Sequence, residues 1–222
     1  MQRSIDCLIV SSLKVLSIAA ALSITGSTAT AGPVPGDGPY QRYPVNQVLR
    51  SETDHCGHKV LLRRGYFNRT TGTGFGFDKM FHKHNLKRAA VFAFVVRDPG
   101  CGQPQGKPPS TTVRYGAYAN HIECGLLLCE VTDISHVLLV VDHRSLRPHE
   151  ISPEDRRANR AISGQKGVIT AFCEGVIRCP DWVDRSINLR AARGRDKRVT
   201  WSYKPLSKDR KYRPGEVPAL KG

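Results

Sequence analysis

The chain has 222 residues, of which 34 are Lys or Arg and 19 are Asp or Glu, so its formal net charge is +15. So large a positive charge favours an anionic partner such as nucleic acid, an anionic cell-surface polymer or an acidic membrane surface. The scarcity of acidic residues argues against the paired carboxylates of a glycoside hydrolase, and no segment after residue 31 is apolar enough to cross a membrane.

The first 31 residues have the three parts of a secretory signal peptide. Arg3 and Lys14 supply positive charge, residues 15–24 form a short apolar core, and residues 29–31 read Ala-Thr-Ala, a small-residue cleavage site. The sequence therefore predicts an exported, extracellular protein.

The rest of the chain divides into a lead-in, one domain and a tail. Residues 32–55 begin with a Pro- and Gly-rich stretch and predict a flexible lead-in. Residues 56–203 suffice for a single domain. Residues 204–222 predict a flexible basic tail, and the longer segment 190–222 holds 11 Lys and Arg against three acids.

The order of the predicted elements is typical of an α+β fold with a mainly antiparallel sheet and about two short helices. Helices are expected over 77–85 and over 152–161, where a Ser is followed by a Pro at the first helical position. The pattern of residues 179–189 is ambiguous. Alternating or β-branched patterns predict strands over 58–67, 87–98, 111–124, 129–133, 136–144, 166–175 and 198–205.

Six cysteines remain after the predicted signal peptide, and an even number in an exported chain predicts three disulfides. Two of the pairs are separated by only a few residues, as across a short turn. The absence of a Cys-x-x-Cys spacing argues against redox catalysis and against a zinc ribbon. The predicted pairs are Cys124–Cys129, Cys173–Cys179 and, by elimination, Cys56–Cys101.

The string GTGFGFDKMFHKHN, residues 72–85, is the most unusual in the chain. Its glycines match neither a dinucleotide-binding fingerprint nor a P-loop, and instead predict a turn that passes close to the sheet. His82 and His84 would point about 200° apart on a helix, so they could not bind one metal ion, and no cofactor is predicted. The helix face expected to lie on the sheet consists of Phe77, Met80, Phe81 and His84.

Metal-independent cleavage of a phosphodiester needs a base, an acid and a cation near the developing negative charge. His84 is the first candidate, with His121 or Glu123 as its counterpart, because these two share one side of a predicted strand. Lys79 would stabilise the charge. A structural role is the alternative for each histidine. The predicted substrate-binding residues are Arg88, Arg114 and Tyr115.

Two resemblances follow from these motifs. The strings RRGYFN, GFGFDKMFHKHN and CPDW, with a Cys pair after a Tyr-rich strand, make residues 60–182 similar to small exported proteins of actinobacteria. The Gly-aromatic-Gly-aromatic loop before a His-bearing helix also resembles the nuclease domains of secreted bacterial toxins. That second resemblance implies metal-independent RNA cleavage by a helix histidine that faces a small antiparallel sheet, and it extends to His84 and Lys79.

Two functions from different classes stay open. The first is a ribonuclease-like hydrolase. The second is a non-enzymatic extracellular protein that binds an anionic polymer or a protein partner through its basic surface. No integral membrane association is expected in either case, and the sequence identifies no inhibitor or immunity protein.

Overall fold

The computed structural model describes residues 44–147, 165–185 and 197–217. The predicted signal peptide and the helix predicted over 152–161 lie outside the described residues. Within them, no helix is both long and apolar enough to span a membrane.

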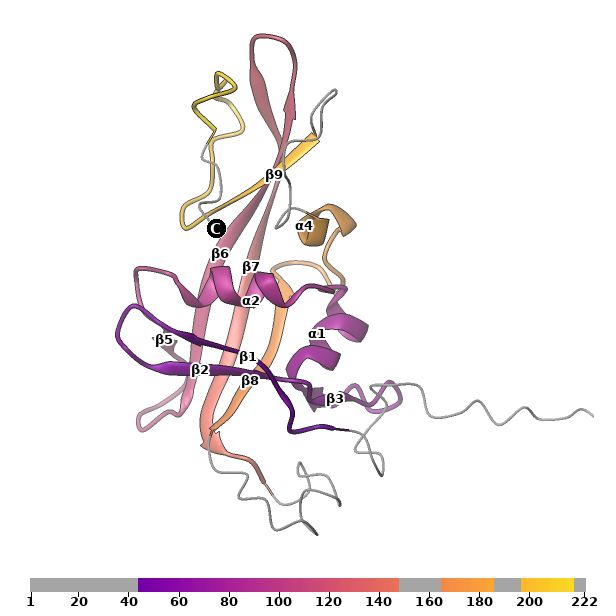
Figure 1. The fold of residues 1–222 in the computed structure, drawn as a ribbon, viewed down its shortest axis with the longest axis vertical. Helices are drawn as coiled ribbons and strands as arrows, with labels where there is room; N and C mark the ends of the chain where they lie inside the picture. Colours follow the sequence, from indigo (N-terminus) through magenta and orange to yellow (C-terminus); the bar gives the residue numbers. More distant parts are fainter. Residues whose placement is uncertain (1–43, 148–164, 186–196, 218–222) are drawn as a thin grey trace, which may run out of the picture. The chain divides into compact units, whose positions relative to one another are not determined.

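A five-stranded antiparallel sheet is the largest sheet of the described residues (Figure 1). Its two longest strands, β6 (Thr112–Cys124) and β7 (Cys129–Ser145), form a hairpin. β8 (Gln165–Cys173) pairs with β7, while β5 (Gln103–Pro104) and β9 (Lys197–Ser202) both pair with the other edge of β6. The predicted α+β fold with a mainly antiparallel sheet is therefore confirmed, although the two strands expected over 129–144 are one continuous strand.

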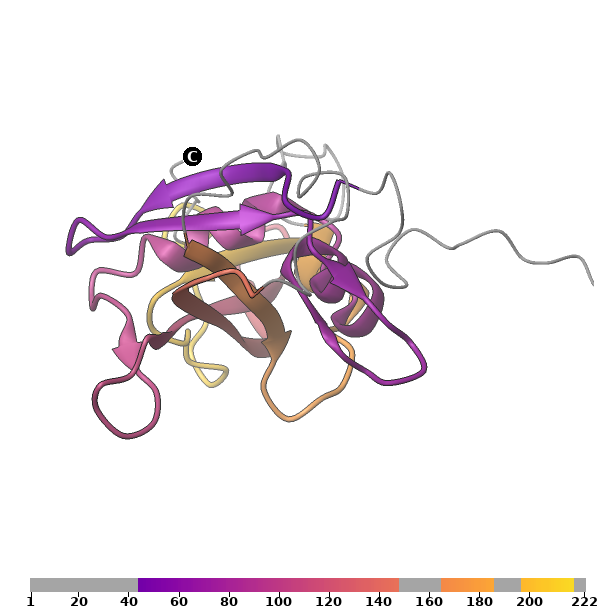
Figure 2. The same cartoon turned by 90° about the horizontal axis from the view of Figure 1, so that it is seen from below.

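A hairpin of β1 (Val48–Thr53) and β2 (Lys59–Arg63) lies over one side of this sheet (Figure 2). β1 belongs to the segment predicted as a flexible lead-in, so that prediction was wrong for residues 48–53. The Pro- and Gly-rich composition that suggested flexibility ends before β1 begins, and β1 then gains an ordered partner in β2.

Residues 87–98, predicted as a strand, contain instead the helix α2 (Ala89–Val96). Every residue of α2 is apolar, so the sequence has no periodicity that distinguishes a helix from a buried strand. The helix lies between the β1–β2 hairpin and the central sheet, where most of its circumference is buried (Figure 2). Its start is fixed by the Arg88 backbone N–H, which donates to the Asp184 carboxylate at 2.9 Å.

The glycine-rich string folds as a small hairpin followed by a helix. β3 (Tyr66–Phe67) pairs with β4 (Gly74–Phe75), which runs directly into α1 (Gly76–His84). The expected turn and helix are confirmed. A Cβ atom on Gly74 would lie only 2.1 Å from the Tyr66 carbonyl oxygen, so the close backbone approach requires glycine there.

The buried face of α1 differs in part from the prediction. Met80 and His84 are buried as expected, and Phe77 is half-buried against the core. Phe81 was wrongly placed on this face, since it is 37% exposed, and Asp78 is buried instead. α1 packs beside β8, at the edge of the sheet (Figure 1), so the burial stripe is rotated relative to that of a helix lying flat on a sheet face.

All three predicted disulfides are present. Cys56–Cys101 joins the β1–β2 turn to the loop after α2, Cys124–Cys129 closes the tip of the β6–β7 hairpin, and Cys173–Cys179 closes the loop after β8.

The C-terminal part is more ordered than its composition suggested. The ambiguous segment contains the short helix α4 (Asp181–Arg185). The predicted flexible tail is instead docked over residues 204–217, because Tyr212 pairs with Cys129 and is buried together with Val217. Basic side chains point outward here while a few apolar ones hold the segment against the hairpin.

Candidate functional site

The two faces of the central sheet differ in what covers them. On β6, Tyr115, Ala117 and Ala119 point into the core. Figure 2 shows α2 and the β1–β2 hairpin on that side of the sheet; within the described residues they have no counterpart layer on the other side. We call the second side the open face. By strand register, it carries Arg114, Gly116, Tyr118, His136, Leu138, Val140, Thr170, Phe172 and, just after β8, Glu174.

His136 occupies the middle of the open face in a defined orientation. Its Nδ1 lies 2.9 Å from Oε2 of Glu174, and its ring stacks on Tyr118 with centroids 4.3 Å apart and an interplanar angle of 11°. A proton on Nδ1 that donates to the carboxylate leaves the lone pair on Nε2. A Cβ on Gly116 would come within 2.7 Å of that Nε2, so the imidazole fits only because residue 116 has no side chain.

Thr170 adds a buried polar group to the same face. Its Oγ1 is buried without a hydrogen-bond partner. The register places it beside Val140, two residues before Phe172. A buried hydroxyl without a partner is unfavourable, so Thr170 lowers the stability of the folded chain.

His84 borders the open face from the edge of the sheet. Its ring lies 5.7 Å from that of Phe172, and its Nδ1 is 3.0 Å from the Ile177 carbonyl oxygen, to which Nδ1–H donates. Burial lowers the pKa of His84 below its ordinary value of 6.5, an effect that the hydrogen bond to Ile177 partly offsets. The imidazole is therefore neutral at neutral pH, with Nε2 available as a base.

Several cations surround His84. Positive charges that lower its pKa further belong to Lys83, Lys79 and Arg178. The pKa of Lys79 is itself lowered, mainly by burial and then by the neighbouring charges of Lys83 and Lys166. Cations gathered this closely repel one another, and an anion bound among them would relieve that repulsion.

The disulfide-closed loop 173–179 holds both imidazoles. Glu174 accepts the hydrogen bond from His136, and the Ile177 carbonyl accepts the one from His84. The same loop supplies Arg178, whose guanidinium donates to the His82 carbonyl at 3.1 Å. This one short loop thus orients two histidines from different elements.

The structure does not bring the predicted catalytic residues together in one site. His121 stacks on Trp182 of α4 with centroids 5.1 Å apart, and its Nδ1 lies 3.1 Å from Oγ1 of Thr132. No hydrogen bond, ion pair or ring contact within the described ranges links His84 to His121. Glu123 lies two residues further along β6, towards the hairpin tip.

The predicted substrate-binding residues also lie in different parts of the structure. Arg114 lies on the open face, whereas the backbone of Arg88 anchors the start of α2 on the other side of the sheet. Tyr115 is 1% exposed and donates its hydroxyl hydrogen to Asp54 Oδ2 at 2.9 Å, so its predicted contact with a substrate is wrong. Alternation along β6 explains this, because neighbours Arg114 and Tyr115 face opposite ways.

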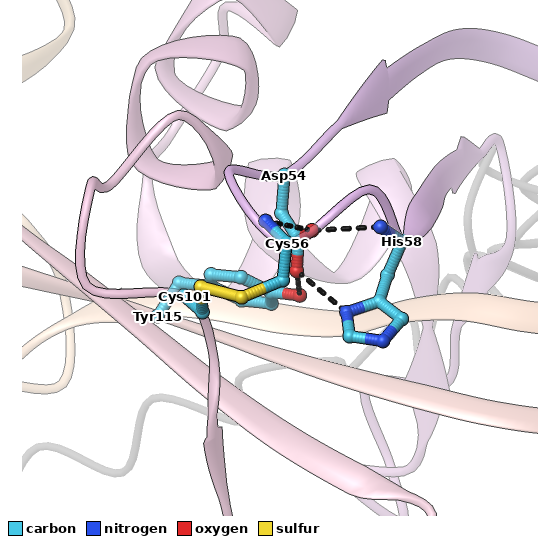
Figure 3. Close-up of polar contacts among 5 residues, drawn as sticks. All are labelled: Asp54, Cys56, His58, Cys101 and Tyr115. Atoms are coloured by element: carbon cyan, nitrogen blue, oxygen red, sulfur yellow. Dashed lines mark hydrogen bonds and ion pairs between the residues drawn. A yellow bond between two sulfur atoms is a disulfide. The ribbon is translucent and has the colours of Figure 1, made fainter.

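A second histidine–carboxylate pair lies in the β1–β2 turn (Figure 3). Asp54 accepts the backbone N–H groups of Cys56 and His58 and lies 3.1 Å from His58 Nδ1. Burial alone would raise the pKa of Asp54, but the hydrogen bonds from His58 and Tyr115 outweigh it and lower the pKa. The carboxylate thus closes the turn beside the Cys56–Cys101 disulfide, which is a structural role (Figure 3).

Sequence reasoning missed His136, Glu174 and Thr170. Alternation along β7 could have placed His136 on one face with Leu138 and Val140. Its pairing with Glu174 depends on the register between β7 and β8, which is shifted by irregularities and has no signal in the sequence. In the described part of the chain, no group of three or more His, Cys, Asp and Glu side chains is arranged to hold a metal ion.

Comparison of the chain with protein-family models, with curated proteins and with solved structures gave no match.

Proposed function

We propose that the protein is an exported, metal-independent ribonuclease-like hydrolase whose site is the open face of the central sheet. The observation that carries the proposal is the His136–Glu174 pair, in which a carboxylate 2.9 Å from Nδ1 fixes an imidazole with Nε2 above Gly116. A histidine oriented in this way is suited to move a proton at Nε2.

Cleavage of RNA requires two proton transfers. A base removes the proton from the ribose 2′-hydroxyl as its oxygen attacks phosphorus, and an acid protonates the departing 5′-oxygen. His84 is neutral because burial lowers its pKa, so it serves as the base. His136, whose Nδ1 lies 2.9 Å from Glu174 Oε2, serves as the acid through its Nε2. The His84 ring contacts Phe172, which is paired with Leu138, two residues along β7 from His136.

The surroundings suit a single-stranded polyanion. The cations around His84 would stabilise negative charge that develops on the phosphate, and Arg114 would contact a neighbouring phosphate. The rings of Tyr118 and Phe172 lie on the same face, where unstacked bases could stack on them.

The test is cleavage of single-stranded RNA by the disulfide-bonded chain, with and without EDTA. We expect cleavage that EDTA does not abolish and a loss of about 100-fold or more in His136→Ala and in His84→Ala. His58→Ala is the matched control, because His58 also pairs with a carboxylate but lies away from the open face. Equal cleavage by the wild type and His136→Ala would rule out this site.

A non-enzymatic role on the same class of polymer is the second candidate, favoured by the cations gathered around His84. It predicts RNA binding that weakens steeply with salt and no cleavage by any variant. Cleavage that depends on His136 would exclude it.

A further inference from the structure

Three consecutive leucines project from the tip of the β6–β7 hairpin. Leu126 is 100% exposed, Leu127 80% and Leu128 42%. The Cys124–Cys129 disulfide closes the loop at its base, and the Gly125 N–H donates to the Leu128 carbonyl at 2.8 Å. The loop is therefore constrained to expose its apolar side chains to water. This exposure is unfavourable, and folding of the domain does not bury these side chains.

The docked tail surrounds the base of this tip with positive charge. Tyr212 and Cys129 exchange two backbone hydrogen bonds of 2.6 and 3.0 Å, which fixes the segment beside the hairpin (Figure 1). The side chains that this segment exposes include the cations Lys208, Arg210, Lys211 and Arg213.

Acidic residues cancel most of this charge: the hairpin end 121–133 and the segment 197–217 together hold seven Lys and Arg against five Asp and Glu. Lys211 pairs with Glu130 at 3.2 Å, and Lys208 pairs with Asp133 at 3.6 Å. Arg210 packs over the Tyr212 ring at 5.0 Å instead of binding a carboxylate of the hairpin. These two segments at the base of the leucine tip thus keep a small excess of positive charge.

We propose that this tip docks the protein on a bilayer that contains anionic phospholipid. The leucines enter the boundary between headgroups and acyl chains, while the cations of the tail bind the phosphates at headgroup depth. A protein partner fits less well, because three side chains on a narrow turn offer far less than the roughly 1,000 Å² of buried area expected of a stable interface. The internal Gly125–Leu128 hydrogen bond also lowers the cost of inserting the turn.

The proposal is independent of the hydrolase site and is tested with vesicles. The disulfide-bonded chain is mixed with vesicles of phosphatidylcholine alone or with an equal amount of phosphatidylglycerol, and the bound fraction is measured by flotation. We expect binding to the anionic vesicles only, weakened by salt. The double variant Leu126→Ser/Leu127→Ser should bind at least about tenfold more weakly.

A matched control is available on β1, away from the tip. Val48 is 46% exposed. Val48→Ser should bind as the wild type does. The inference is overturned if wild-type protein ignores anionic vesicles or if the leucine variant binds equally well. Leucine-dependent self-association without vesicle binding would assign the tip to a second copy of the chain and would overturn it too.

Discussion

Tyr115 and Asp54, 61 residues apart, are joined by a buried hydrogen bond of 2.9 Å in which the phenol donates to Oδ2 of the carboxylate (Figure 3). This bond ties the β1–β2 hairpin to the middle of the central sheet. Burial raises the pKa of Tyr115, and the adjacent Asp54 carboxylate raises it further, so the phenol stays protonated and remains a donor.

Replacing Tyr115 with Phe should therefore destabilise the fold. The variant removes one donor to a buried carboxylate while it keeps the ring, and the expected cost is about 1.5–3 kcal/mol of unfolding free energy. Urea denaturation monitored by fluorescence measures it. Tyr118→Phe, on the open face, is the control and should change stability little. A Tyr115→Phe variant as stable as the wild type would show that the bond contributes nothing.

Stability should depend on the protonation of His84. Its folded-state pKa lies below the ordinary 6.5, so on acidification the unfolded chain binds a proton before the folded chain does. Stability from this residue is present above about pH 6.5 and is lost as the pH falls towards the folded-state pKa.

The check is urea denaturation at about pH 7.5 and about pH 5.5, on either side of the ordinary imidazole pKa. In His84→Asn, the side-chain amide can donate to the Ile177 carbonyl but does not titrate. The loss of stability between the two pH values should be smaller in this variant. An unchanged loss would show that other groups cause it.

Gly116→Ala tests whether the space under His136 is needed. The new methyl group would lie 2.7 Å from Nε2, so the imidazole must move away from Tyr118 and Glu174. On the proposed mechanism, RNA cleavage should fall about 100-fold while the fold persists. Gly125→Ala is the matched control, since its Cβ would meet nothing closer than 3.7 Å. Equal effects of the two substitutions on cleavage would contradict the assignment of His136.

Thr170→Val should stabilise the free protein. Valine has nearly the same shape and removes a buried hydroxyl that has no partner, so unfolding free energy should rise by about 1 kcal/mol. RNA affinity should fall at the same time if the hydroxyl contacts the substrate. Thr111→Val is a useful contrast, because Thr111 donates to Asp142 at 3.1 Å and its loss should destabilise. A destabilised Thr170→Val would mean that the hydroxyl is satisfied in solution.

Much of the fold could be predicted from local sequence signals. The alternation in β6, the glycine turn before α1 and the closely spaced cysteines each reflect a constraint within a few residues. α2 could not be predicted, because a helix buried on most of its surface has the same apolar composition as a buried strand.

The candidate site was harder to predict than the fold. His84 was correctly expected to point inward, but its neighbours could not be named, because His136 and Glu174 meet only through pairing across strands. The prediction combined His84 with residues of β6 on the basis of residue type. The fold instead directs His121 to Trp182 and Tyr115 to Asp54.

The Cys173–Cys179 bond has a consequence for where the protein can act. The loop that it closes supplies the carboxylate that orients His136 and the carbonyl that orients His84. Reduction of this single bond would release both anchors and leave the central sheet intact. On the proposed function, RNA cleavage would depend on this bond and would be lost in a thiol-rich compartment.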